Sequence, residues 1–393
     1  MCAQMLASGT TDPSNTKAVV NATGATRSLH ESDLVYQGSF RVPHADTLHD
    51  ANGLGLDYGG TAVGFNPANN SLFMVGHDWD QLSTELGIPA TLGSGATVGN
   101  WPLATVLQPL TDALEGHRED VAVNTGDKNT KVGGQFVYNG QLYVTTYVYY
   151  GASEAHVVYQ RSPSLQAART LIGGMALGPL GPDFYSGYMA LVPPEWQSAL
   201  GGPALIGNCC LSTVARTSYG PAVSAVNPAT LTPSAATAAT TLLYYPSDHT
   251  TLGNWGDPGV NLLFNGSTQI HSVVFPGGTS SVLFFGKQGV GPYCYGEGAE
   301  CKDPAIGSKG DHAYPYSYYV WAYDAHDLAA VKAGQKQAWA VKPYTVWGLT
   351  LPTNGEGSGR IGGAAYDPAT GRIFVSQQFG DGIYPVVHVF TVR

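Results

Sequence analysis

Ionisable side chains stand at or near the start of five similar apolar segments of the chain. They are Asp57, Tyr58, Lys131, Asp183, His271 and Arg360. Two carboxyl groups can act as general acid and base, or as acid and nucleophile, on a glycosidic bond. A histidine and a tyrosine beside an arginine can instead remove a proton next to a carboxylate and protonate a leaving oxygen. Both reactions require a fold that brings the five segments together.

A second set of residues occupies the longer connections and is suited to holding a substrate. The set consists of Trp79, Lys131, Arg216, Tyr219, His312, Glu356 and Gln377. Aromatic rings combined with a few well-placed polar groups are typical of ligand sites. Here the mixture suits carbohydrate, whose rings stack on Trp and Tyr and whose hydroxyls pair with polar side chains. Glu356 is also a third carboxylate candidate beside Asp57 and Asp183.

The five segments share one form, which is a group of small residues, an alternating apolar strand, a short turn and a second apolar strand. YGGTAVGFNPANNSLFMVGH shows the form, and further copies start near Val132, Ser186, Ile270 and Ile361. Turns such as NPANN, YNG and DPATG contain the residues typical of β-hairpin loops between two strands. A third and a fourth strand follow in most copies. Four-stranded units that repeat along a chain predict the blades of a β-propeller.

The fifth copy has three strands before the chain ends, and the missing strand is found near the other terminus as DLVYQGSFRVP. A strand that completes the last blade closes the ring and removes its open edges. We therefore predict an all-β, five-bladed propeller over residues 33–393. The uneven spacing of the copies leaves six- and seven-bladed rings open. Residues 1–32, rich in Ser, Thr, Ala and Asn, are expected to form a flexible tail.

This architecture resembles the five-bladed propellers that several glycoside hydrolase families use. The resemblance implies a general acid and a general base drawn from the inner-strand starts of different blades. Asp57 and Asp183 fit by position, with Glu356 as the third candidate. No local motif identifies one of these families, so the resemblance covers the fold alone.

Three functions remain open from the sequence. The first is a glycoside hydrolase with paired carboxylates. The second is a polysaccharide lyase in which His271 is the base, Tyr58 or Tyr219 the acid, and Arg360 with Lys131 neutralises a uronate. The third is a non-catalytic carbohydrate-binding or surface propeller. The long loops differ strongly from blade to blade, which favours one central pocket on the long-loop face over repeated lectin pockets.

The five cysteines indicate the redox environment in which the protein is found. Cys294 and Cys301 enclose a short glycine-containing loop and predict a disulfide, hence an oxidising environment. Cys209 and Cys210 are adjacent, and we predict a vicinal disulfide at the rim of the pocket beside Arg216 and Tyr219; two reduced cysteines are the alternative. Cys2 is a candidate lipid anchor. The predicted location is secreted, periplasmic or cell-surface.

The charge pattern excludes some partners. The formal net charge is −10 with 18 Lys and Arg residues, which argues against a nucleic-acid backbone because phosphate binding needs clustered cations. No apolar run reaches the roughly 18 residues of a membrane helix. Asp78 and Asp80 are weak candidates for a structural Ca²⁺ site. We expect a monomer with no other cofactor.

Overall fold

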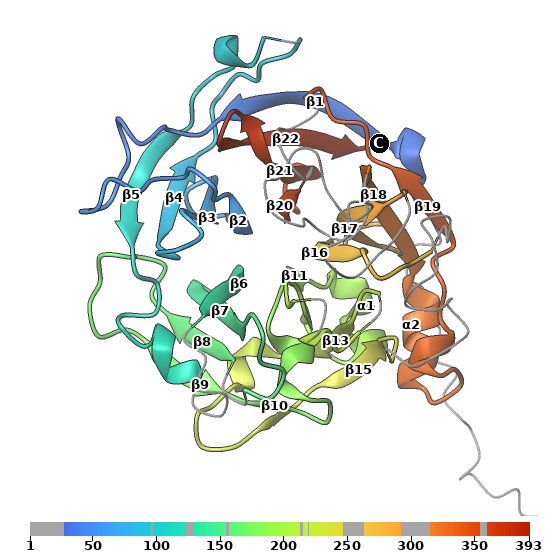
Figure 1. The fold of residues 1–393 in the computed structure, drawn as a ribbon. Helices are drawn as coiled ribbons and strands as arrows, with labels where there is room; N and C mark the ends of the chain where they lie inside the picture. The colour runs from blue at the N-terminus through green and yellow to red at the C-terminus, as the bar shows by residue number, and fades with distance from the viewer. Residues whose placement is uncertain are drawn as a thin grey trace, which may run out of the picture.

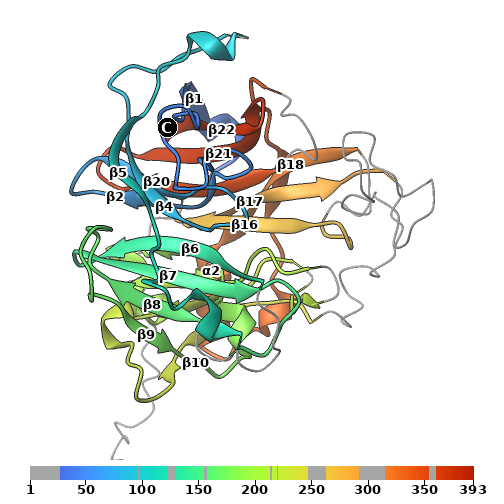
Figure 2. The same cartoon turned by 60° about the vertical axis from the view of Figure 1, so that its left-hand side comes forward.

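The computed structural model describes residues 27–95, 97–122, 129–154, 157–212, 215–218, 220–246, 263–291, 315–353 and 360–393. Five four-stranded sheets stand around a common axis in these residues (Figure 1). The first strand of each sheet lies nearest the axis and the last lies at the rim, as the order from β6 to β9 shows (Figure 2). The predicted all-β, five-bladed propeller is confirmed, and rings of six or seven blades are excluded.

The blades are numbered along the chain, and neighbouring strands within each are antiparallel. Blade one contains β2 (Thr61–Asn66), β3 (Ser71–Val75), β4 (Ser83–Gly87) and β5 (Thr105–Thr111). Blade two contains β6 (Thr130–Tyr138), β7 (Gln141–Val148), β8 (Val158–Arg161) and β9 (Ile172–Met175). Blade three contains β11 (Met189–Leu191), β12 (Ala204–Gly207), β13 (Val223–Val226) and β15 (Thr240–Leu243). Blade four contains β16 (Gln269–Val274), β17 (Ser281–Gly289), β18 (Tyr316–Asp324) and β19 (Thr345–Gly348).

Blade five is completed by the N-terminal strand, as the sequence predicts. It contains β20 (Ile361–Asp367), β21 (Arg372–Asp381), β22 (Tyr384–Val392) and β1 (Leu34–Arg41). Leu34 lies opposite Val392 and Arg41 lies opposite Val386 in an antiparallel pair. The ring is thus held closed by backbone hydrogen bonds between strands from opposite ends of the chain.

The hydrophobic core is divided into five clusters, one at each interface between neighbouring blades. Strand alternation explains the division. In β3, Leu72 and Met74 face blade five, whereas Phe73 and Val75 face blade two. Because successive side chains of a strand point to opposite faces, a fully apolar strand buries both faces of its blade.

Small residues lie at the start of the inner strands, because neighbouring blades approach one another closely at the axis. A Cβ on Gly133 would lie 1.9 Å from the carbonyl oxygen of Ser186, and one on Gly362 would lie 1.9 Å from that of Gly60. No side chain fits at either position. The small residues that mark the repeat in the sequence are therefore the contacts between neighbouring inner strands.

Short elements decorate the blades. Between β11 and β12 the helix α1 (Pro194–Leu200) forms, with proline in its first turn and Gly201 (φ 99°) ending it. Its Trp196 is fully buried and donates Nε1–H to the carbonyl of Thr279 (2.9 Å). The remaining elements include α2 (Ala325–Lys332), β10 (Leu177–Gly178), β14 (Thr237–Ala238), η2 (Glu31–Asp33), η4 (Arg118–Val121) and η5 (Pro182–Tyr185). No helix within the described ranges is long and apolar enough to span a membrane.

Most of the predicted tail, residues 1–26, lies outside the described residues. Its last residues, 27–32, pack against blade four. Leu29 is fully buried, donates its N–H to Oγ of Ser281 (2.8 Å) and accepts the hydroxyl of Tyr344 (2.6 Å). This segment leads directly into β1.

Candidate functional site

The connection between β3 and β4, residues 76–82, is an ordered loop that presents Trp79 to solvent. The N–H of His77 donates to the carbonyl of Gly55 (2.8 Å), and that of Gln81 donates to the carbonyl of His77 (3.0 Å). The N–H of Trp79 donates to Nδ1 of His77 (3.1 Å), yet Trp79 is 75% exposed. A loop that is already ordered loses little entropy on binding, which makes this indole a good stacking platform.

Blade two bonds to the same loop. Nζ of Lys131 in β6 lies 2.5 Å from Oδ2 of Asp78. Nη1 of Arg118 in η4 donates to the carbonyls of Trp79 (3.3 Å) and Asp80 (2.5 Å). The loop therefore belongs to the interface between blades one and two and is fixed from both sides.

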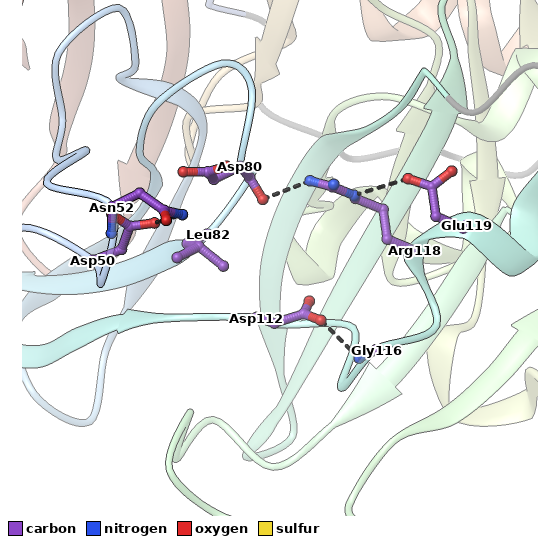
Figure 3. Close-up of a pocket in the computed structure, with 8 residues that line it drawn as sticks. All are labelled: Asp50, Asn52, Asp80, Leu82, Asp112, Gly116, Arg118 and Glu119. Carbon is purple, nitrogen blue, oxygen red and sulfur yellow. Dashed lines mark hydrogen bonds and ion pairs between the residues drawn. The ribbon is translucent and has the colours of Figure 1, made fainter.

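A cavity of about 320 Å³ opens between the loops of blades one and two (Figure 3). It is lined by Asp50, Asn52, Asp80, Leu82, Asp112, Gly116, Arg118 and Glu119. Asp50 and Asp80 come from the blade-one side, and Arg118 and Glu119 approach from η4 (Figure 3). The lining is strongly polar, with four carboxyl groups and one guanidinium.

Asp50 and Asp80 both line this cavity. Burial raises the pKa of Asp80, and the neighbouring carboxyl group of Asp50 raises it further. Burial also opposes ionisation of Asp50, but the N–H groups of Leu54 (2.9 Å) and Asn52 (2.8 Å) hold its pKa below the ordinary value. Asp80 is therefore the harder of the two carboxyl groups to ionise.

Aromatic rings continue from Trp79 toward the axis. The ring centroids of Trp79 and His77 are 5.0 Å apart, those of His77 and Tyr58 5.5 Å, and those of Tyr58 and Phe379 6.0 Å. Tyr58 is 46% exposed. Asp57 lies beneath this row, where it is buried, accepts the N–H of Gly55 (2.8 Å) and places Oδ2 3.7 Å from Nε2 of His77. Asp57 orients His77 and does not face solvent.

Asp183 lies in η5, which packs against β12 and β13 of blade three. It is 1% exposed. Burial, with the neighbouring charge of Glu154, raises the pKa of its carboxyl to about 8. A raised pKa is what a general acid needs, but a side chain closed off from solvent cannot reach a glycosidic oxygen. The structure does not bring Asp57 and Asp183 together in one open site.

The predicted vicinal disulfide between Cys209 and Cys210 is present. It lies at the starts of the inner strands, closer to the axis than the rim position expected from the sequence. Sγ of Cys209 is 3.3 Å from the carbonyl oxygen of Gly133, and Sγ of Cys210 is 3.5 Å from Nδ1 of His271. The expected neighbour Arg216 instead donates Nη1–H to the carbonyl of Gly266 (3.2 Å).

The structure also gives the surroundings of two further predicted site residues, Gln377 and Arg360. Gln377 is fully buried, accepts from Nε2 of His388 (2.8 Å) and donates to the hydroxyl of Tyr318 (2.8 Å), so it belongs to the interior of blade five. Arg360 lies near Tyr147: burial raises the pKa of the Tyr147 hydroxyl, and the charge of Arg360 opposes that rise. The predicted residues Tyr219, Cys294, Cys301, His312 and Glu356, and the lipid-anchor candidate Cys2, lie outside the described residues.

The residues proposed for calcium are used in other contacts, Asp78 with Lys131 and Asp80 with Asp50. In the described part of the chain, no three His, Cys, Asp or Glu side chains form a metal-binding group. A structural Ca²⁺ ion stays a prediction.

The pocket residues were not all identified from the sequence. The sequence predicts Asp80 only as a calcium candidate, and it does not mark Asp50, Asn52, Asp112, Arg118 or Glu119 as catalytic or binding residues. Each lies in a long polar loop where acids usually face solvent. The signal that would have helped is the convergence of two such loops from adjacent blades, because the 4–1 connections of a propeller emerge on one face.

No protein-family model matches the sequence, and the comparison with curated proteins finds no relative. Among solved structures, a glycosyl hydrolase from Bacteroides ovatus is similar over 93% of this chain and 96% of that chain, with 10% identity and a TM-score of 0.42. An α-L-arabinanase mutant from Cellvibrio cellulosa is similar over 85% and 91%, with 10% identity and a TM-score of 0.42.

The Dos1 propeller is also similar, over 84% of this chain and 67% of that one, with 8% identity and a TM-score of 0.30. Glycosidase propellers are therefore among the structures that resemble this chain, in keeping with the fold-level resemblance expected from the sequence. Identities and TM-scores this low carry no argument about activity, so function must be argued from the site.

Proposed function

We propose that the protein hydrolyses glycosidic bonds in the cavity between blades one and two. The observation that carries the proposal is Asp80, a carboxyl group with a raised pKa in an open cavity with four carboxyl groups, next in sequence to the exposed Trp79. A carboxyl group with a raised pKa is suited to protonate a leaving glycosidic oxygen. A sugar ring stacked on Trp79 would lie next to it.

The partner of Asp80 must come from the blade-two side. Glycoside cleavage needs two carboxyl groups roughly 5 to 10 Å apart, and Asp50 lies on the same side of the cavity as Asp80 and raises its pKa. Both carboxylate oxygens of Asp112 already accept backbone N–H groups, from Leu114 (2.8 Å) and Gly116 (2.7 Å). Glu119 is the remaining carboxylate, and Nε of Arg118 lies 3.4 Å from its Oε1.

Each residue then has a role in the proposal. Asp80 is the general acid, and the neighbouring Asp50 contributes to its raised pKa. Glu119 is the nucleophile or the base that activates water, and the Arg118 guanidinium is its ion-pair partner. The sequence-based alternative, with Asp57 and Asp183 as the pair, is less well supported because both side chains are buried.

A non-catalytic carbohydrate-binding function is the second candidate. It is favoured by the four carboxyl groups that line the cavity, because carboxylates are good hydrogen-bond acceptors for sugar hydroxyls without any reaction. The lyase alternative, with His271, Tyr58, Arg360 and Lys131, stays a prediction. So do a secreted or envelope location and a monomeric state.

One experiment separates these functions. The protein is incubated with a panel of neutral and uronic polysaccharides, and reducing ends are followed together with the ultraviolet absorbance of unsaturated products. Reducing ends without that absorbance support hydrolysis, and both signals together support a lyase. Neither signal, combined with measurable binding, supports the carbohydrate-binding function.

Substitutions then test the assignment. Asp80→Asn and Glu119→Gln keep the shape of the cavity and should each lower the hydrolysis rate at least about a hundredfold. Asp327→Asn, on α2, removes a surface carboxylate that pairs with Lys336 (2.7 Å) and is the matched control. Full activity in Asp80→Asn would refute the proposed acid.

A further inference from the structure

We propose that reduction of the Cys209–Cys210 disulfide opens a zinc-binding site that His271 completes. Sγ of Cys210 lies 3.5 Å from Nδ1 of His271. In a tetrahedral zinc site with Zn–S of about 2.3 Å and Zn–N of about 2.0–2.1 Å, neighbouring sulfur and nitrogen ligands are about 3.6 Å apart. The two side chains are therefore already at the spacing of two ligands of one ion.

The imidazole of His271 is oriented for this role. Its Nε2 lies 3.4 Å from Oε1 of Gln269, two residues earlier on β16. That contact favours the tautomer that carries its proton on Nε2, which leaves the lone pair of Nδ1 directed at the sulfur. Metal-binding histidines commonly donate their other N–H to an oxygen acceptor in this way.

The second sulfur is held in the same place. Cys209 is buried and its Sγ lies 3.3 Å from the carbonyl oxygen of Gly133 on blade two. The N–H of Ser212, just beyond the pair, donates to the carbonyl of Tyr149 (2.9 Å). The backbone hydrogen bond of Ser212 does not depend on the sulfur–sulfur bond, so we expect the loop, with both cysteines, to stay beside His271 after reduction.

A dithiol reductant supplies the electrons and protons that the reduction of the Cys209–Cys210 disulfide requires. It transfers two electrons and two protons to the disulfide, the sulfur–sulfur bond breaks, and the reductant becomes a cyclic disulfide. Zn²⁺ then binds both sulfurs as thiolates and releases their two protons, while Nδ1 of His271 is the third ligand and water the fourth. In the oxidised chain the sulfurs are bonded to each other, and no metal-binding group exists among the described residues.

Zinc binding would change the covalent and metal links between blades three and four near the axis. In the oxidised chain the disulfide joins two adjacent residues within one loop of blade three. In the reduced, metal-bound chain the same loop is tied through the ion to β16 of blade four. This inference does not depend on the proposed hydrolase activity.

The test uses the full chain with Cys2, Cys294 and Cys301 replaced by serine, so that Cys209 and Cys210 are the remaining cysteines. The protein is reduced with a dithiol, freed of reductant without air, and titrated with Co²⁺, whose thiolate complexes absorb in the near ultraviolet. We expect one Co²⁺ per reduced chain, displaced by Zn²⁺, and no such absorption in the oxidised chain.

Variants identify the ligands. His271→Gln should weaken Co²⁺ binding at least about tenfold, and Gln269→Ala, which keeps all three ligands, should weaken it less. His326→Gln on α2, where the imidazole contacts Asp324 (2.8 Å), is the control and should bind as the parent does. Absence of the thiolate absorption in the reduced parent, or equal affinity in His271→Gln, overturns the proposal. If His271→Gln does not fold, equal affinity in parent and Gln269→Ala would also count against it.

Discussion

Nδ1 of His271 lies 3.5 Å from Sγ of Cys210, so the inner strand of blade four meets a loop of blade three at the axis. The same loop contacts blade two through Cys209 and Gly133 (3.3 Å). Three blades therefore converge on the vicinal disulfide. Because Gly133 and His271 belong to the inner strands β6 and β16, the loop lies near the centre of the ring.

Breaking this disulfide should have a small effect on stability. A bridge between adjacent residues closes a loop of two, for which the chain-entropy relation gives about 1 kcal/mol. For a domain this large we expect a decrease in Tm of about 1–2 °C. The measurement is thermal unfolding of the oxidised and reduced forms of the chain that lacks the other three cysteines. A decrease in Tm of more than about 10 °C would show that the disulfide makes a large contribution to the stability of the ring.

Trp79→Ala should separate binding from folding. Because Trp79 is 75% exposed, its removal should change the free energy of unfolding by less than about 0.5 kcal/mol. Affinity for an oligosaccharide substrate should fall at least about tenfold if the indole is a central contact. Leu107→Ala, at an exposed position of β5, is the matched control for loss of apolar surface. Unchanged affinity would remove Trp79 from the proposed site.

Asp183→Asn should alter the pH dependence of stability. The folded pKa of Asp183 is raised to about 8 from the ordinary 3.8. Between these values the folded chain holds a proton that the unfolded chain releases, so stability falls as pH rises, by up to about 1.4 kcal/mol per pH unit. The amide cannot ionise and should abolish this slope. We expect the variant to exceed the wild type in Tm near about pH 8 and to match it near about pH 4.

His388 should make stability depend on pH in the opposite direction, so that stability falls as pH decreases. Burial lowers the pKa of His388 to about 3, and the neutral ring is hydrogen-bonded to Ser39 (2.6 Å) and Gln377 (2.8 Å). Below about pH 6.5 the unfolded chain gains a proton that the folded chain does not, so stability falls as pH decreases toward about 3. His388→Gln should flatten this acid limb in unfolding measurements. An unchanged limb would mean that other groups determine it.

Removal of the closing strand should be far more damaging than any of these changes. A chain that starts at residue 42 lacks β1, which leaves β22 with an unpaired edge and exposes the core around Phe40. We expect loss of cooperative unfolding together with aggregation. A chain that starts at residue 27 keeps β1 and is the control. Equal Tm values for the two chains would refute the role of ring closure.

The sequence alone was sufficient for the fold. Five copies of one strand pattern, each with apolar residues on both faces of its strands, have no stable arrangement except blades packed side by side. The complementary strands at the two ends of the chain predict closure, which the pairing of Leu34 with Val392 confirms. The adjacent cysteines likewise predicted their own bridge, because no distant partner was needed.

The site was decided by tertiary structure. Asp50 and Asp80 are thirty residues apart, and they line one cavity only because two connections of blade one emerge on the same face. Sequence position placed Asp183 near the axis, but the packing of η5 on blade three buries it. Strand patterns are local and repeat, so they can be read from the chain. Loop positions and the pKa values of their acids depend on which neighbouring blade each loop meets, and that information is present only in the folded ring.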